Sequence, residues 1–213
     1  MEITAYVVDE LRIVPLAVSA PREIPERAIW VDVVEATREE TISLTEQLGL
    51  HLEIDTVDLG FDVYGHVEVE GDQLTVLLHA ERADVGDGVA TAKGVVLMNT
   101  HRLVTVRSGS VPAIEAATRS VTDMEPGPHP RMQLVIQILA GAMEITSRAL
   151  DAAEAEVHRS ARILFSTAET SRAEVDLENV LSGLGRLQAR MVVLRYRHLS
   201  FLKTSSVARC ELR

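Results

Sequence analysis

The stretch that decides the fold is AIWVDVVEATREETISLTEQLGLHLEIDTVD, residues 28–58. Every second residue of the run 29–33 is a β-branched apolar residue, and this period of two predicts a buried strand. Thr37 and Glu40 then form a T-x-x-E capping box, in which each side chain accepts a hydrogen bond from the other's backbone amide. A helix is therefore predicted to begin there and to end at Gly49 in a left-handed stop. Taken alone, this segment is one strand and one helix of an ordinary α/β domain.

Composition indicates one compact domain with an appendage. The chain has 213 residues, of which 46% are apolar and only 3% aromatic, so the core must consist of Val, Leu, Ile and Ala. Its single cysteine, Cys210, excludes an internal disulfide and a multi-cysteine zinc site. This usage is typical of a reducing cytosolic compartment.

No secretory signal or membrane span is predicted. Charged residues and a proline interrupt residues 1–18, unlike a secretory signal. The longest apolar run, 132–143, is shorter than the roughly 20 residues that cross a bilayer. We therefore do not expect these residues to conduct ions by themselves.

The charge is unevenly distributed along the chain. The net charge is -11, and residues 184–213 hold seven basic residues against one acid, or +6, so residues 1–183 carry -11 minus +6, which is -17. An acidic body of this kind disfavours nucleic acid as a partner and attracts cations. Simple solubility is the other explanation for the same acidity.

Turn signals divide the first part of the chain into short strands. Strands are expected at 3–8, 11–18, 66–69, 74–79, 89–98 and 103–106, with a hairpin turn at Glu70–Asp72. A helix is expected at 111–121, with Ser110 as its N-cap and Pro112 in its first turn.

A proline-rich elbow at 122–130 separates this part from a helical one. Three-and-four spacing of apolar residues predicts a helix at about 132–165. A second capping box, Ser171 and Glu174, begins another helix at about 177–202. Two long helices with a short polar link predict an antiparallel hairpin, although a plain helical bundle would show the same features.

Catalytic motifs are missing from the sequence. Gly86-x-Gly88 lacks the third glycine of a dinucleotide-binding loop, and neither a P-loop nor G-x-S-x-G occurs. The seven histidines are scattered without the spacing of H-E-x-x-H. We therefore expect this chain not to be an enzyme.

Three segments together resemble the cytoplasmic N-terminal domain of the CorA family of divalent-cation transporters, which includes the zinc-transporting ZntB branch. In the first segment the matching residues are Trp30, Asp32, Thr37, Glu39, Glu40, Leu48, Gly49, Leu50 and His51. The second match is the pair of predicted strands within 72–83 and 95–107, and the third is the helix within 128–157. The resemblance rests on the order and spacing of these signals, since none is specific alone.

The resemblance implies a fold and a domain organisation. The fold would be α/β (α+β), an αβα sandwich with a mixed central sheet followed by a long antiparallel helical hairpin. The sandwich would occupy 1–128, the hairpin 129–206 and a C-terminal tail 207–213. In the family a stalk helix and the pore follow, and neither these helices nor the Gly-Met-Asn pore signature occurs in this sequence; its nearest string, Leu97-Met98-Asn99, falls in a predicted hairpin.

The resemblance also implies a regulatory metal site. In the family Mg²⁺ is held between neighbouring protomers by an acid that follows a central strand, with help from acids on nearby helices. Asp84 falls at the first position and Asp151 near the second. Hard cations take oxygen ligands and keep several waters, so one or two carboxylates suffice for a weak site. A solvated turn for Asp84 and a surface charge for Asp151 are the alternatives.

Two functions follow as expectations. In the first, the chain is the sensor domain, on the cytoplasmic side of the cell membrane, of a CorA-like transporter of Mg²⁺, with Zn²⁺, Co²⁺ and Ni²⁺ left open. Cation binding between protomers would gate the pore of the full-length protein, which is a pentamer in the family and would associate more weakly without the stalk. The chain would meet the membrane only through a C-terminal part that is not in this sequence. In the second, it is a free-standing soluble interaction module that keeps the fold without transport.

Overall fold

The predicted strand of the quoted stretch forms β3 (Ala28–Val34), inside a mixed seven-stranded sheet with the order β2-β1-β3-β7-β6-β5-β4. The other strands are β1 (Glu2–Asp9), β2 (Arg12–Val18), β4 (Val67–Glu70), β5 (Gln73–Glu81), β6 (Thr91–Met98) and β7 (Leu103–Ser108). Neighbouring strands are antiparallel except β3 and β7, which run parallel. This computed structural model describes residues 1–52, 67–81, 91–167, 182–189, 191–192, 194–195 and 199.

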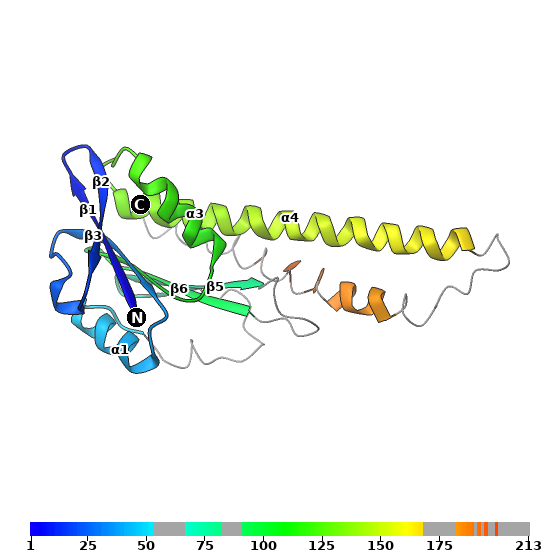
Figure 1. Cartoon of the computed structure of the whole chain (residues 1–213), viewed down its shortest axis with the longest axis horizontal. Coiled ribbons are helices and arrows are strands. Elements are labelled where there is room, and N and C mark those ends of the chain that lie inside the picture. The colour runs from blue at the N-terminus through cyan, green and yellow to red at the C-terminus, as the bar shows by residue number, and fades with distance from the viewer. Residues whose placement is uncertain are drawn as a thin grey trace.

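Helices cover both faces of the sheet, as Figure 1 shows. One face carries α1 (Arg38–Gln47), and the other carries α3 (Pro112–Ser120) and the 38-residue α4 (Pro130–Thr167). Two short 3₁₀ turns, η1 (Pro21–Glu23) and η2 (Val121–Asp123), lie between these elements. The predicted α/β class with a mixed central sheet is confirmed.

Each face of the sheet has its own apolar core. Between α1 and the sheet, Leu44 and Leu48 pack on the side chains that β1, β3, β6 and β7 direct to that face. On the opposite face, Ile114 of α3 and Ile138 of α4 pack on the sheet, in a core that also contains Trp30. Both faces of β3 are therefore buried, which explains why this strand holds few polar residues.

The local signals around α1 act as the sequence predicts. Thr37 is the N-cap, and its hydroxyl accepts from the amide of Glu40 at 3.2 Å while the Glu40 carboxylate accepts from the amide of Thr37 at 2.8 Å. The hydrogen bond from the Thr37 amide stabilises the charged carboxylate and lowers the pKa of Glu40. Gly49 has a φ of 70° and Leu50 donates to the carbonyl of Thr45, which ends the helix in a Schellman-type stop.

The predicted cap of α3 is wrong by one residue. Val111, not Ser110, is the N-cap, and no side chain caps this helix, whereas Pro112 occupies the first turn as predicted. Val111 is 2% exposed, because it packs on β6 at Gly94. The contact is close: a Cβ atom added to Gly94 would lie 3.3 Å from Val111 Cγ2 and 3.2 Å from Ile114 Cδ1. Burial of the valine therefore decides where the helix begins.

The long helix α4 begins two residues before its predicted start. Gln133 donates from its amide nitrogen to the carbonyl of His129, so Pro130 takes the first helical position, where a missing N–H costs little. The Gln133 side chain also accepts from the amide of Gly127 at 3.0 Å, which ties the elbow to the helix. The first turns of α4, up to Ala142, belong to the core below α3, and the helix then extends well beyond the sheet (Figure 1).

The second predicted helix is described only in part. Residues 182–189 are helical, and Leu194 is 2% exposed. The second capping box, Ser171 and Glu174, and the tail 207–213 lie outside the described residues. Separate domains at 1–128 and 129–206 stay a prediction.

Within the described ranges, no helix combines the length and the apolar character that crossing a lipid bilayer requires.

Candidate functional site

The two predicted metal ligands have different outcomes. Asp84 lies outside the described residues. Asp151 is exposed on α4, nine residues beyond Ala142, the last residue of that helix in the sheet core. No group of three or more His, Cys, Asp or Glu side chains that could hold a metal ion occurs among the residues with described positions. Within the described ranges, Asp151 is therefore one exposed carboxylate and not a member of such a group.

Asp151 lies between two ion pairs on the same helix. Arg148 pairs with Glu144 and Arg159 pairs with Glu156, both on exposed positions. Glu154, three residues after Asp151, is also exposed, and residues three apart on a helix are neighbours. Sequence reasoning singled out Asp151 and missed Glu154, although the i, i+3 spacing was visible.

A buried polar network joins β3 to β7 and α3. Asp32 is 3% exposed, and its carboxylate accepts from the Thr105 hydroxyl at 2.6 Å and from the Arg107 guanidinium at 3.1 Å. The Thr105 hydroxyl in turn accepts from the Trp30 indole at 3.0 Å. Arg107 also pairs with Glu115 of α3 at 3.3 Å. The network gives the buried Asp32 carboxylate hydrogen-bond donors and a positive charge, and it links α3 to the sheet through Arg107 and Glu115.

Tyr6 of β1 lies beside this network. Its ring stacks on Trp30 with the ring centroids 4.4 Å apart and an angle of 16° between the planes. Burial raises the pKa of Tyr6 to about 12, the negative charge of Asp32 acts in the same direction, and Arg107 opposes it. The neutral phenol is therefore the form that suits the folded chain.

We expect the free energy of unfolding to fall as the pH rises from 10 to 12. The folded-state pKa of Tyr6 is raised above its ordinary value of 10, so this contribution is fully present below pH 10 and is lost as the pH passes the folded value of about 12. The loss is about 2 kcal/mol. Urea unfolding at pH 9, 10, 11 and 12 measures it, and Tyr6→Phe should remove this part of the pH dependence. An unchanged pH profile in Tyr6→Phe would contradict the assignment.

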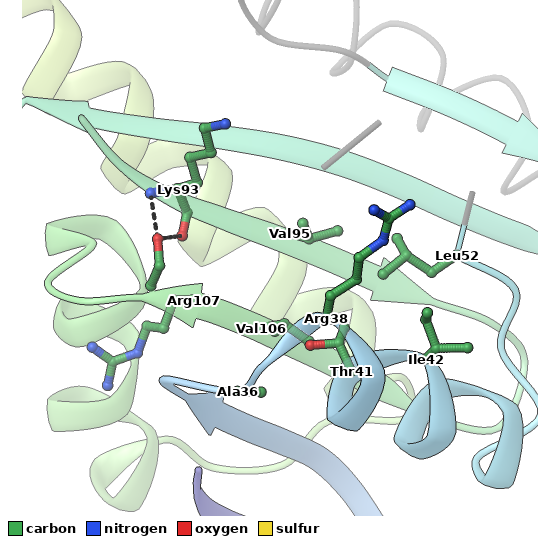
Figure 2. A pocket seen from close by; sticks show the side chains of 10 residues that line it. Ala36, Arg38, Thr41, Ile42, Leu52, Lys93, Val95, Val106 and Arg107 are labelled. Atoms are coloured by element: carbon green, nitrogen blue, oxygen red, sulfur yellow. Dashed lines mark hydrogen bonds between the residues drawn. The ribbon is translucent and has the colours of Figure 1, made fainter. Parts of the chain in front are cut away.

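A small groove lies on the face of the sheet that α1 covers, between the start of α1 and strands β6 and β7. It has a volume of about 150 Å³. Its residues are Ala36, Arg38, Thr41, Ile42, Leu52, Lys93, Val95, Val106, Arg107 and Ser108. Figure 2 shows Arg38 extending from α1 beside Leu52, while the side chains of Lys93 and Arg107 point away from the apolar floor. Arg38 and Lys93 also take part in other interactions.

The β6–β7 turn ties several segments together at one end of the sheet. The Asn99 side chain accepts from the amides of His101 and Arg102 and donates to the carbonyl of Gly49. Arg131, in the first turn of α4, donates to the carbonyl of His101. These contacts fix the base of α4 to the sheet.

Comparisons with known proteins agree with this architecture. Among solved structures, the soluble domain of CorA from Methanocaldococcus jannaschii is similar at 14% identity and a TM-score of 0.53, over 96% of this chain and 94% of that one. The complete CorA magnesium transporter of the same organism gives 15% and 0.54, over 99% and 77%. The ZntB cytoplasmic domain from Vibrio parahaemolyticus gives 11% and 0.55, over 99% and 97%. At these identities the likeness shows the fold alone.

Sequence comparison supplies the family. No curated protein matches the chain significantly. The family described as CorA-like Mg²⁺ transporter protein matches over residues 25–207, which include strands β3 to β7 and helix α4. Members of this family are transporters and not enzymes, in agreement with the missing catalytic motifs. This chain belongs to the family of CorA-like Mg²⁺ transporter proteins.

Proposed function

We propose that this chain is the cytoplasmic regulatory domain of a CorA-like divalent-cation transporter. The observation that carries the proposal is the family match over 25–207, which runs from β3 through β7 and into the helical part. The fold shared with the soluble domain of an archaeal CorA and with a ZntB cytoplasmic domain supports the same role. A free-standing interaction module remains the second candidate, and it would have the fold without a cation response.

The proposed ligand is a hard divalent cation, Mg²⁺ first, bound between protomers. Asp151 is an exposed carboxylate that no ion pair neutralises within the described part of the chain, and Asp84 would supply the second carboxylate. Mg²⁺ keeps several waters and needs only one or two protein carboxylates. Carboxylates from two neighbouring chains therefore suffice for a weak site, and the acidic body, with -17 over residues 1–183 of the -11 chain, raises the local cation concentration.

Cation binding at such a site would act through the association of protomers. A bound cation relieves repulsion between the carboxylates of neighbouring chains and so favours the arrangement that brings them together. The pore is biased only to the extent that the cation binds one arrangement more tightly than the other. We propose the pentamer of the family as the assembly and a closed pore as the cation-bound state.

Titration calorimetry with Mg²⁺ tests the site in the full-length assembled protein. We expect Asp84→Ala to weaken binding at least about tenfold and Asp151→Ala to weaken it less, because a lost carboxylate removes a ligand from a site that has few. Asp123→Ala, at an exposed acid of η2, is the matched control and should bind like the unaltered protein. Equal binding by Asp84→Ala and the unaltered protein would remove Asp84 from the site, and no Mg²⁺ binding at all would favour the interaction module.

A further inference from the structure

Strand β2 forms one edge of the sheet and is unusually apolar for that position. Its residues after Arg12 read IVPLAV and contain no charge. Pro15, Leu16 and Ala17 are exposed, and Leu16 is 36% exposed. An exposed apolar edge strand is a ready template for a strand from another chain. Pro15 is the one residue in this run that opposes such pairing.

The register shows which way the backbone of Pro15 faces. Asp9 pairs with Arg12 across the two-residue turn Glu10–Leu11, and Tyr6 pairs with Pro15. In a two-residue hairpin the pair that closes the turn is hydrogen-bonded, and bonded and non-bonded pairs alternate from there. Tyr6–Pro15 is therefore a non-bonded pair, three pairs beyond the turn. The backbone groups of residues 13, 15 and 17 face outward, and at 15 the N–H is missing.

We propose that Pro15 prevents edge strand β2 from pairing with β2 of a second copy of this chain and so directs self-association to other surfaces. The two-fold antiparallel pair that centres on residue 15 would place residue 15 opposite itself and Ile13 opposite Ala17. Its central residues would exchange two hydrogen bonds, and proline removes both donors at once. This inference rests on the sheet register and does not depend on the proposed transport role.

Pro15→Thr tests the proposal, because it restores the N–H without adding apolar surface. Analytical ultracentrifugation over a concentration series should show self-association at least about tenfold tighter than in the unaltered chain, since two backbone hydrogen bonds are regained. Ala17→Thr is the matched control: it places the same residue at a neighbouring outward position and keeps Pro15, so its self-association should not change. Circular dichroism and urea unfolding establish that each variant is folded, and Pro15→Ala is the second variant if Pro15→Thr is not.

Cross-linking tests the register. With Cys210→Ser and Pro15→Thr in both chains, one chain carries Val14→Cys and the other Leu16→Cys. These positions face each other in the two-fold pair as non-bonded neighbours about 4.5 Å apart at Cα, within disulfide reach. We expect a disulfide in the mixture and none in either chain alone. Unchanged self-association of a folded Pro15 variant, or equal cross-linking when Pro15 is retained, would overturn the proposal.

Discussion

Replacing Arg107 with Met is expected to lower the free energy of unfolding by about 3–5 kcal/mol, because it leaves the Asp32 carboxylate buried without its cation. The side chain of Arg107 is 13% exposed and that of Asp32 4% exposed, so water cannot easily take the place of the guanidinium. The Thr105 hydroxyl would remain as the hydrogen-bond donor to Asp32. Urea unfolding at pH 7, followed by circular dichroism, measures the loss.

Arg148→Met is the matched control for this prediction. Arg148 also pairs with a carboxylate, that of Glu144, but its side chain is 75% exposed. The loss there should be at most about 0.5 kcal/mol. Asp32→Asn added to Arg107→Met should recover most of the stability, since it removes the unpaired charge. If Arg107→Met costs no more than Arg148→Met, the network is not a stabilising buried ion pair.

Replacing Ile138 with Ala is expected to cost about 2–5 kcal/mol, as large-to-small changes in a packed core do. Ile138 is fully buried in the first turns of α4, in the core that also contains Trp30 and Ile114. Because the helix and the sheet share this core, the sheet should lose stability together with α4. Thermal unfolding followed at 222 nm and by Trp30 fluorescence should show one transition shifted equally at both signals.

Ile136→Ala removes the same atoms from the same helix two residues away. Ile136 is 57% exposed, so its loss should be within about 0.5 kcal/mol. Suppose that Ile138→Ala lowers the transition temperature measured at 222 nm but not the one measured by Trp30 fluorescence. This result would show that α4 and the sheet unfold independently. The helical part from residue 129 would then behave as the separate domain that the sequence predicts.

Features that depend on neighbouring residues could be predicted from the sequence. The capping box at Thr37, the stop at Gly49 and the tight turn at Gly71 each need only a few adjacent residues, and all three occur. The predicted N-cap of α3 was wrong because a contact with a distant strand outweighs the local signal. Ser110 is the better cap chemically, but contact between Val111 and the sheet at Gly94 is stronger, and that contact comes from a strand 17 residues earlier in the chain.

Features that join distant residues could not be predicted. Nothing near Asp32 indicates that its partner is Arg107, 75 residues away, or that β3 and β7 run side by side in parallel. The sequence placed Asp151 on a helix and offered a surface charge as one explanation, but it did not indicate how far beyond the sheet core the residue lies. Family resemblance supplied the candidate metal ligands, because isolated carboxylates carry no spacing signal of their own.

The parallel contact between β3 and β7 governs the order in which the chain can assemble. Strands β1 to β3 and strands β4 to β7 are each joined by antiparallel neighbours, whereas Asp32 and Thr105 meet across a separation of 73 residues. Closing so long a loop costs entropy before any contact repays it. During synthesis the β3 edge of the unit β2-β1-β3 therefore stays unpaired until β7 leaves the ribosome. The chain is most exposed to aggregation in that interval.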